Sequence, residues 1–241
     1  MAVPKSARVV GVQKLGADTR LLDLVSDEPL GFVGGQYVII DSGLVLPNGK
    51  AVKRAYSMLS SDAEQTRFQL AVKRLPGGPG SGFMHELDPA TELRFSGPWG
   101  KLYPQNGTAG PTLVLATDTG ITAVLGLVQS ARLGPLMAKT VFIWLRTSPD
   151  YFLHEALVRE RVPTACCELR IEALPTVGHP ERIPHVRAVL REVLARVRVE
   201  QAFLSGDGAV NYALLDDLVA AGVPATKDSV ESFFNMPRKS T

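Results

Sequence analysis

Short apolar runs separated by turn residues fill the first hundred positions of the chain. Val, Ile, Leu and aromatic residues concentrate in six runs of strand length, and Gly, Pro and Asn separate several of them. One short helix is predicted at 80–87. Six strands at this spacing favour a small antiparallel β-barrel. The predicted strands cover residues 6–15, 19–26, 36–41, 54–59, 67–72 and 92–97.

The pattern changes near residues 103–112, where Pro, Gly and Asn predict a linker. Strands and helices alternate beyond it, which predicts a parallel sheet with helices on both faces. We therefore expect two domains, an antiparallel β-barrel over 1–104 and an α/β parallel-sheet domain over 105–241. The strands of the second are predicted at 112–117, 140–146, 166–174, 200–206 and 227–234, and its helices at 120–133, 150–161, 183–197 and 209–223.

Composition excludes several classes of protein. The net charge is +2, with 45% hydrophobic and 21% charged residues, which argues against nucleic acid or an anionic membrane as the main partner. No run approaches the roughly 18 apolar residues of a membrane span, and the start lacks a signal-peptide pattern. We expect a cytoplasmic protein. The adjacent Cys166 and Cys167 cannot hold an iron–sulfur cluster or a four-thiolate zinc site, so we expect no metal and two core residues in a reducing compartment.

The run from Arg54 to Ser57 combines a cation, an aromatic ring and a hydroxyl. In a strand, Arg54 and Tyr56 would share one face, and Ser57 would turn to the other or sit at the strand end. These groups suit a ligand with an anionic end and an aromatic end. An ordinary surface strand explains the same residues, so the run alone leaves both interpretations open.

Loops that follow the parallel strands are the next candidates, because ligands bind at the carboxyl ends of such strands. Thr119, Gly120 and Thr122 follow the first of them, where a helix N-terminus offers free N–H groups to a phosphate. The loop at 80–82 could also cradle phosphate on its backbone. Each loop equally fits a plain turn, and the chain contains no Gly-x-Gly-x-x-Gly fingerprint.

Taken in order, the motifs resemble those of the ferredoxin–NADP reductase family, and the size of the chain is that of its compact bacterial type. The resemblance spans residues 7–234. It rests on the family patterns Arg-x-Tyr-Ser/Thr, a strand followed by a Gly/Ser loop, Gly-Pro-x-Gly, Gly-Thr-Gly-Ile-Thr-Pro and Cys-Gly. In the same order, the residues of this chain that match these patterns are 54–57, 71–74 together with 80–82, 97–100, 118–123 and 205–206.

This resemblance implies a flavoprotein that moves hydride between NADP(H) and FAD, and electrons singly to or from ferredoxin or flavodoxin; NAD(H) is a possible coenzyme. It implies that Arg54 pairs with the FAD pyrophosphate, that Tyr56 stacks on the isoalloxazine and that Ser57 bonds near flavin N5. Ser57, Ser205 and Glu231 are the expected catalytic residues. The other residues expected to bind cofactors are Ala55, Ala71, Val72, Lys73, Gly80, Ser81, Gly82, Thr119, Gly120, Thr122 and Asp207.

The C-terminal end carries a further implication of the resemblance, that an aromatic residue covers the flavin face that nicotinamide must reach. Phe234 is the expected cover, because Phe233 and Phe234 alternate across a strand and only one of them can face the flavin. The tail at 236–241 is expected to continue past the ring, toward the adenosine half of FAD or into solvent.

The chain departs from the family pattern at several positions. Asp118 and Ala123 replace Gly and Pro, and Ser205 replaces a common Cys. A usual arginine for the 2′-phosphate of NADP is missing at residues 178–180. Arg187 lines up with another such arginine, and Arg182 or Arg146 could substitute.

Two alternatives to a ferredoxin reductase therefore stay open. One is a reductase that acts on a small acceptor, such as a ferric chelate or a free flavin, or on an oxygenase component. The other is a non-catalytic nucleotide-binding or sensor module, to which the Asp118 departure gives some weight.

Overall fold

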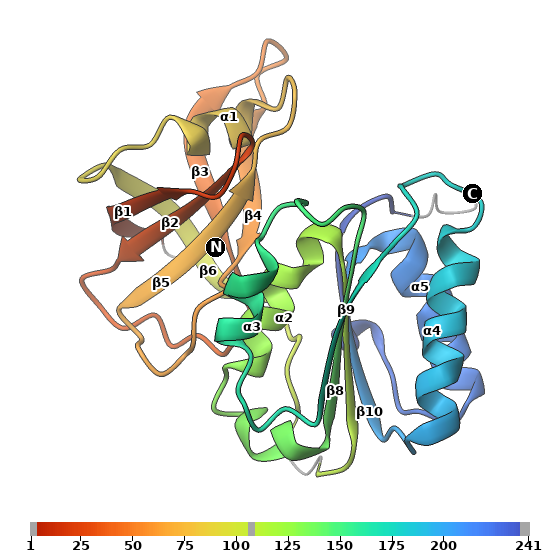
Figure 1. The fold of residues 1–241 in the computed structure, drawn as a ribbon. Coiled ribbons are helices and arrows are strands. Elements are labelled where there is room, and N and C mark those ends of the chain that lie inside the picture. Colours follow the sequence, from red (N-terminus) through yellow and green to blue (C-terminus); the bar gives the residue numbers. More distant parts are fainter. Residues whose placement is uncertain (1–3, 106–108, 237–241) are drawn as a thin grey trace.

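The computed structural model describes residues 4–105 and 109–236, and its first half is a curled antiparallel sheet (Figure 1). The strand order is β4-β3-β6-β1-β2-β5. The N–H of Leu59, just after β4, donates to the carbonyl of Gln69 in β5, which brings the two edge strands together. The elements are β1 (Lys5–Lys14), β2 (Thr19–Val25), β3 (Tyr37–Val45), β4 (Ala51–Ser57), β5 (Arg67–Lys73), α1 (Pro79–His85) and β6 (Glu92–Trp99).

Period-two alternation explains the core of this barrel-like sheet. Leu22 and Leu24 of β2 lie opposite Leu70 and Phe68 of β5, and all four side chains are fully buried. Each such burial is worth about 1.5–3 kcal/mol relative to exposure. Alternate residues of the same strands therefore fix the register of the strand pairs.

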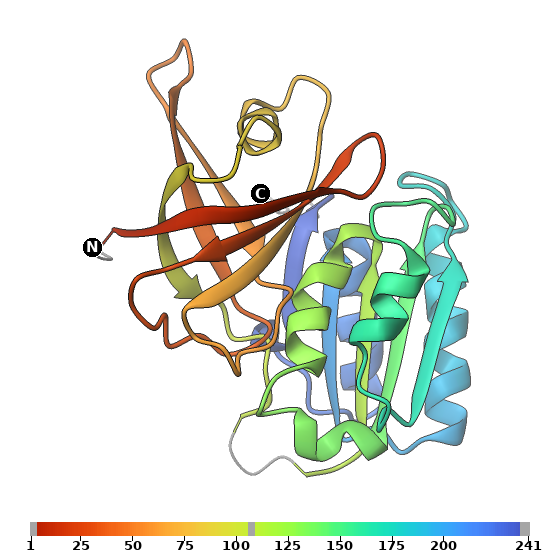
Figure 2. The same ribbon diagram turned by 60° about the vertical axis from the view of Figure 1, so that its left-hand side comes forward.

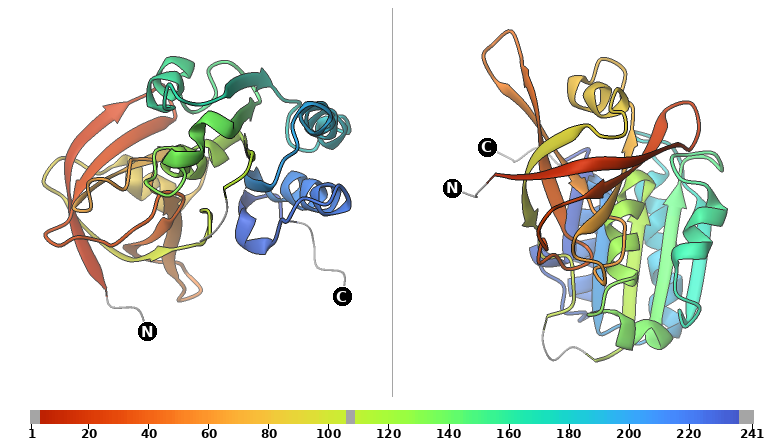
Figure 3. Two further views of the ribbon diagram at one scale, coloured as in Figure 1. Left: turned by 90° about the horizontal axis from the view of Figure 1, so that it is seen from below. Right: turned by 90° about the vertical axis from the view of Figure 1, so that its left-hand side faces the viewer.

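The second half is a five-stranded parallel sheet of order β11-β10-β7-β8-β9. Figure 1 shows it edge-on, with α2 and α3 on the side of the barrel and α4 and α5 on the other; the view from below in Figure 3 shows the same layers. The elements are β7 (Thr112–Thr117), η1 (Asp118–Gly120), α2 (Ile121–Val128), η2 (Gly134–Lys139), β8 (Thr140–Arg146), α3 (Glu155–Arg161), β9 (Glu168–Ala173), α4 (Arg182–Arg196), β10 (Gln201–Asp207), α5 (Gly208–Ala220), η3 (Lys227–Ser229) and β11 (Val230–Phe234).

Strand β7 shows why this sheet is covered on both faces. Val114 and Ala116 pack into the hydrophobic cluster that includes α2, whereas Leu113 and Leu115 pack into the cluster under α4 and α5. Successive residues of a strand point to opposite faces, so a continuous apolar run needs two covers. The predicted fold class, an antiparallel barrel followed by an α/β parallel sheet, is confirmed.

Several predicted boundaries are wrong, for local reasons. The helix expected over 150–161 begins at Glu155, because Phe152 adopts a left-handed backbone with φ of +65°. The helix expected over 120–133 ends at Val128, and the last strand begins at Val230 after a 3₁₀ turn. Residues 106–108 of the predicted linker lie outside the described residues.

Two glycines allow close backbone contact between the barrel and α2. A Cβ on Gly126 of α2 would lie 2.2 Å from the carbonyl oxygen of Met58, and a Cβ on Gly34 would lie 2.0 Å from that of Gly126. Only glycine permits such contact between the backbones of helix and barrel. Figure 2 shows β11 beside the barrel as well. In the described part of the chain, no helix is long and apolar enough to cross a membrane.

Candidate active site

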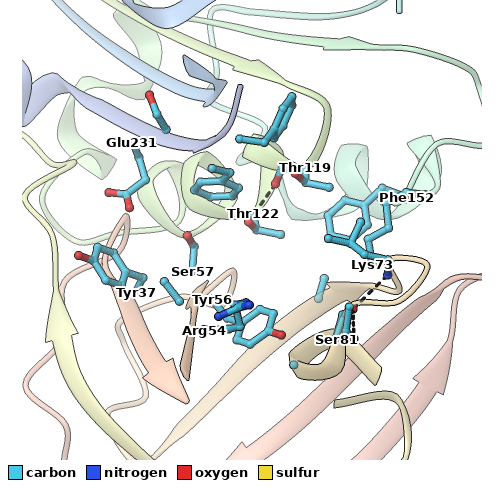
Figure 4. Close-up of a pocket in the computed structure, with 18 of the residues that line it drawn as sticks. Tyr37, Arg54, Tyr56, Ser57, Lys73, Ser81, Thr119, Thr122, Phe152 and Glu231 are labelled. Carbon is cyan, nitrogen blue, oxygen red and sulfur yellow. Dashed lines mark hydrogen bonds between the residues drawn. The ribbon is translucent and has the colours of Figure 1, made fainter. Parts of the chain in front are cut away.

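A cavity of about 560 Å³ lies between the barrel and the carboxyl edge of the parallel sheet. Figure 4 shows residues of β4, β5 and α1 facing residues of η1, α2 and β11 across it. Its size is ordinary for a small-molecule or cofactor site. The predicted site residues that line it are Arg54, Ala55, Tyr56, Ser57, Ala71, Lys73, Gly80, Ser81, Thr119, Thr122, Glu231 and Phe234.

On the barrel wall, a cation meets the start of a helix. A Cβ on Gly80 would lie 2.6 Å from Cγ of Arg54, so only glycine lets α1 approach this side chain so closely. The first turn of α1 leaves the N–H groups of Gly80 and Ser81 without partners in the helix. The Ser81 hydroxyl accepts from Leu75 N and donates to Gly78 O, which fixes the loop. This exposed cation and the free N–H groups fit a phosphate.

Tyr56 and Ser57 stand at the end of β4. Burial raises the pKa of Tyr56 to about 12, so its hydroxyl stays protonated near neutral pH. Ser57 is buried beside Tyr37, its cross-strand partner in β3. The wall therefore offers one aromatic ring and one small hydroxyl, which suits a flat heteroaromatic ligand.

The opposite wall begins with Thr119 and Thr122. The Thr122 hydroxyl donates to the carbonyl of Thr119 at 3.1 Å, and both side chains line the cavity. Gly120, predicted as a binding residue, packs inward: a Cβ there would lie 2.4 Å from the carbonyl of Ser205. The glycine is therefore needed for contact between η1 and β10 and does not line the cavity.

Glu231 lies at the end of the cavity near Tyr37. Burial raises the pKa of Glu231 to about 7, so its carboxyl group can hold a proton near neutral pH. Burial, and then the charge of Glu231, raise the pKa of Tyr37. Ser205 pairs with Glu231 in the sheet register, but its buried hydroxyl has no hydrogen-bond partner among the described residues and does not line the cavity.

The C-terminal strand differs from the alternating strand that the sequence predicts. In the pairing with β10, Gly206 opposes Ser232 and Asp207 opposes Phe234, so Phe233 is the extra residue of a bulge. Both phenylalanines consequently line the cavity, and the expectation that only Phe234 could do so is wrong. After the strand, the chain passes over the start of α5; residues 237–241 of the predicted tail lie outside the described residues.

Two of the arginines proposed for the 2′-phosphate are used inside the protein. Arg182 is 3% exposed and bonds to Asp118, Asp207 and a backbone carbonyl. Arg146 is 7% exposed and pairs with Glu155 at 2.6 Å. Carboxylates already pair with these buried guanidinium groups, which argues against either arginine as the reader of a 2′-phosphate. Their assignment to the 2′-phosphate stays a prediction.

The remaining candidate, Arg187, is exposed and pairs with Asp217 of α5 at 2.7 Å. It does not line the cavity, and its role in binding a 2′-phosphate stays a prediction.

The family model that matches this chain is that of the oxidoreductase FAD-binding domain, over residues 6–103. Along the whole length, ferredoxin–NADP reductase B of Sorangium cellulosum is 32% identical over 247 residues, which cover 99% of this chain and 96% of that protein. The chain belongs to the ferredoxin–NADP reductase family. It is thus an FAD-binding oxidoreductase, and the Arg54–Gly80 cradle beside the Tyr56 ring fits that cofactor.

This member of the ferredoxin–NADP reductase family is also similar to an oxygenase-type reductase in sequence and to a solved ferredoxin reductase in structure. The reductase subunit of an aromatic O-demethylase from an Amycolatopsis species is 31% identical over 131 residues, 52% of this chain and 38% of that protein. A Neisseria gonorrhoeae ferredoxin NADP+ reductase, solved with bound FAD and NADP, has a TM-score of 0.74 at 17% identity, covering 97% of this chain and all of that one. The second likeness is one of fold.

Three more predicted cofactor residues, Val72, Gly82 and Asp207, do not line the cavity. Val72 is 1% exposed in the barrel core, and Gly82 faces open space within α1. Asp207 is fully buried and caps α5, because its carboxylate accepts from the N–H groups of Ala209 and Val210. The prediction that these three touch a cofactor is not supported by their positions.

Sequence reasoning missed the loops after β8 and β9, which supply Tyr151, Phe152 and Val177 to the cavity. The Lys73 ammonium lies 4.5 Å from the centroid of the Tyr151 ring and also pairs with Asp18, so this loop contacts the barrel. The sequence could have indicated these residues, because they follow parallel strands at the carboxyl ends, where ligands bind.

The two cysteines differ in environment. Cys166 is partly buried, whereas Cys167 is exposed, which corrects the prediction that both are core residues. Across residues 4–105 and 109–236, no group of three or more His, Cys, Asp or Glu side chains is arranged to hold a metal.

Proposed function

We propose that this reductase moves hydride between NADP(H) and FAD and exchanges single electrons with ferredoxin or flavodoxin. The observation that carries the proposal is the cavity between the two halves, with a phosphate cradle and a ring on one wall and hydroxyls with a protonatable carboxyl on the other. The full-length similarity to a ferredoxin–NADP reductase supports it. Bound FAD would supply both hydride exchange and one-electron transfer.

The residues of the barrel wall bind and orient the flavin in this proposal. Arg54 and the N–H groups of Gly80 and Ser81 neutralise the pyrophosphate, and Tyr56 contributes a stacking ring. Ser57 offers a hydroxyl donor at the buried end. A planar guanidinium suits phosphate oxygens because it can donate two parallel hydrogen bonds.

The second wall serves the coenzyme. Thr119 and Thr122 present hydroxyl groups at the start of α2, and Glu231 can hold or release a proton beside the nicotinamide. Phe233 and Phe234 exclude water from the flavin, and they must move aside before a nicotinamide ring can reach it. Ser205 becomes a nicotinamide contact only after that movement. We also place the protein in the cytoplasm, where NADPH is available.

The preference for NADPH over NADH tests whether Arg187 binds the 2′-phosphate. If Arg187 leaves Asp217 to bind the 2′-phosphate, Arg187→Gln raises the Michaelis constant for NADPH about tenfold, the loss of one charged hydrogen bond. The constant for NADH stays unchanged. Steady-state flavin reduction with both coenzymes measures this, and equal effects on the two would assign Arg187 a structural role.

The acceptor is tested by anaerobic turnover with NADPH and one acceptor at a time: ferredoxin, flavodoxin, ferric citrate and free riboflavin. We expect the highest kcat/KM with ferredoxin or flavodoxin. Faster turnover with both small acceptors would replace the proposal by a small-molecule reductase. A protein that binds flavin but is never reduced by NADPH would be a non-catalytic module.

A second candidate function is the reductase component of an oxygenase, which the similarity to the aromatic O-demethylase reductase subunit favours. Ferredoxin distinguishes the two, because an oxygenase reductase of this kind would deliver electrons to its own oxygenase faster than to ferredoxin. A comparison of both acceptors at equal concentration decides between them.

A further inference from the structure

A buried guanidinium, that of Arg182, bonds to two buried carboxylates at the carboxyl edge of the parallel sheet. Arg182, the first residue of α4, donates from Nε to Asp207 at 2.8 Å, from Nη2 to Asp118 and from Nη1 to the carbonyl of Pro175. The three charged side chains are 0–3% exposed. A buried charge is stable only when it is paired and hydrogen-bonded, so these contacts hold one geometry.

The two carboxylates extend this contact to the other strand ends. Oδ1 of Asp118 accepts from the N–H and the hydroxyl of Thr147, which follows β8. Oδ1 of Asp207 accepts from the side-chain amide of Asn235 at 2.8 Å, just after β11. Together with Pro175 after β9, the network therefore reaches the carboxyl end of each of the five parallel strands.

Both ends of the network adjoin the cavity. Asp118 directly precedes Thr119, and Asn235 directly follows Phe234, and both of these neighbours line the cavity. Asp118 and Asn235 have positive φ values of +50° and +51°, a backbone that is rare outside glycine and is held here by their side-chain bonds.

We propose that Arg182 is a positioning residue that holds Phe234 over the flavin, acting through Asp207 and Asn235, with Asp118 fixing the guanidinium from the other side. The Asp118 that replaces the family glycine is then part of this device. The proposal rests on the proposed function only in taking the cavity as the flavin site. It makes Asp118 and Asn235 act on the same property of the bound flavin although they share no direct contact.

A double-mutant cycle on the FAD-bound protein tests this coupling. Asp118→Gly and Asn235→Gly each remove one side chain and keep a residue that accepts positive φ. Asp118→Gly removes the bonds to Arg182 and Thr147, and Asn235→Gly removes the bond to Asp207. Because these residues act on the flavin only indirectly, each single variant should speed the release of FAD about threefold to tenfold, the effect of one typical net hydrogen bond. The double variant should release FAD no faster than the more affected single variant, because both substitutions break the same network.

The control is Arg196→Gln, at the far end of α4, where the guanidinium forms an exposed pair with Glu168. Its FAD release should equal that of the wild type. Thermal unfolding midpoints of the same samples separate local loosening from partial unfolding. Wild-type release rates in both single variants, or rates that multiply in the double variant, would overturn the proposal. Failure of NADPH to reduce the flavin would instead remove the proposed function and leave this result standing.

Discussion

The two walls of the cavity use their charged residues in opposite ways. On the barrel wall, Arg54 is exposed, and within residues 4–105 and 109–236 its side chain donates to one acceptor, the carbonyl of Lys53. On the sheet wall, Arg182 and Arg146 are buried and bonded to carboxylates. The positive charge of the barrel wall is therefore available to a ligand, whereas the arginines of the sheet wall stabilise the loops of their own domain.

This difference separates binding residues from positioning residues. Removing an exposed cation should lower the affinity for a ligand and leave the stability of the fold unchanged. Removing a buried, paired cation should instead lower the free energy of unfolding. The sheet wall meets its ligand instead with hydroxyls, aromatic rings and Glu231. Substitutions on the two walls should thus have separable effects on stability and on affinity.

The largest expected effect is on the sheet wall. Arg182→Met leaves two buried carboxylates without their cation and should lower the free energy of unfolding by about 3–5 kcal/mol. Urea unfolding of the FAD-bound protein measures it. The exposed pair of Arg196 on the same helix is the control, and Arg196→Gln should unfold like the wild type. Similar losses in both variants would remove the distinction between the walls.

Glu231 should make stability depend on pH. Its folded-state pKa of about 7 exceeds the usual value of 4.5, so its contribution is present below pH 4.5 and is lost as pH rises through 7. Relative to Glu231→Gln, the wild type should lose at most about 3 kcal/mol across this window. Unfolding curves at several pH values measure the difference. A difference that stays constant with pH would mean that the carboxyl is not desolvated.

On the barrel wall, Arg54→Met should raise the FAD dissociation constant about tenfold to hundredfold, because one or more charged hydrogen bonds to phosphate are lost. The stability of the flavin-free protein should hardly change. Lys53→Met is the matched control, since Lys53 pairs with Asp41 and does not line the cavity. Equal FAD affinities for the two variants would place the pyrophosphate elsewhere.

The smallest effect concerns the ring beside the flavin. Tyr56→Ala should weaken FAD binding by about 0.5–1.5 kcal/mol beyond the lost contact area and raise flavin fluorescence, because a stacked ring is removed. Tyr56→Phe keeps the ring and should match the wild type in a fluorescence titration. If alanine and phenylalanine behave alike, the ring packs on something other than the flavin.

Most of the fold could be predicted because burial imposes a period on the sequence. Alternation set the strands of the barrel, and the continuous apolar run of β7 predicted a sheet covered on both faces. On the barrel wall, the side chains of Arg54, Tyr56 and Ser57 lie within four residues of one strand, so their convergence was visible in the sequence.

The sheet wall was harder to predict because its determinants are distant in sequence. The ion pair of Arg182 with Asp118 joins residues 64 positions apart, and no local pattern shows that this arginine is unavailable to a phosphate. The bulge at Phe233 and the left-handed Phe152 are also set by packing against neighbouring segments. Sequence analysis singled out Asp118, Arg182 and Phe233 without showing the orientation of their side chains, and it missed Phe152.

The central claim is that NADPH reduces a flavin held in the cavity between the two walls. Anaerobic stopped-flow mixing of the purified protein with NADPH, and separately with NADH, tests it most directly. The account predicts rapid bleaching of the absorbance of bound FAD by NADPH, with heat-released flavin that is FAD. A protein that carries no FAD, or whose FAD neither coenzyme bleaches, would contradict it.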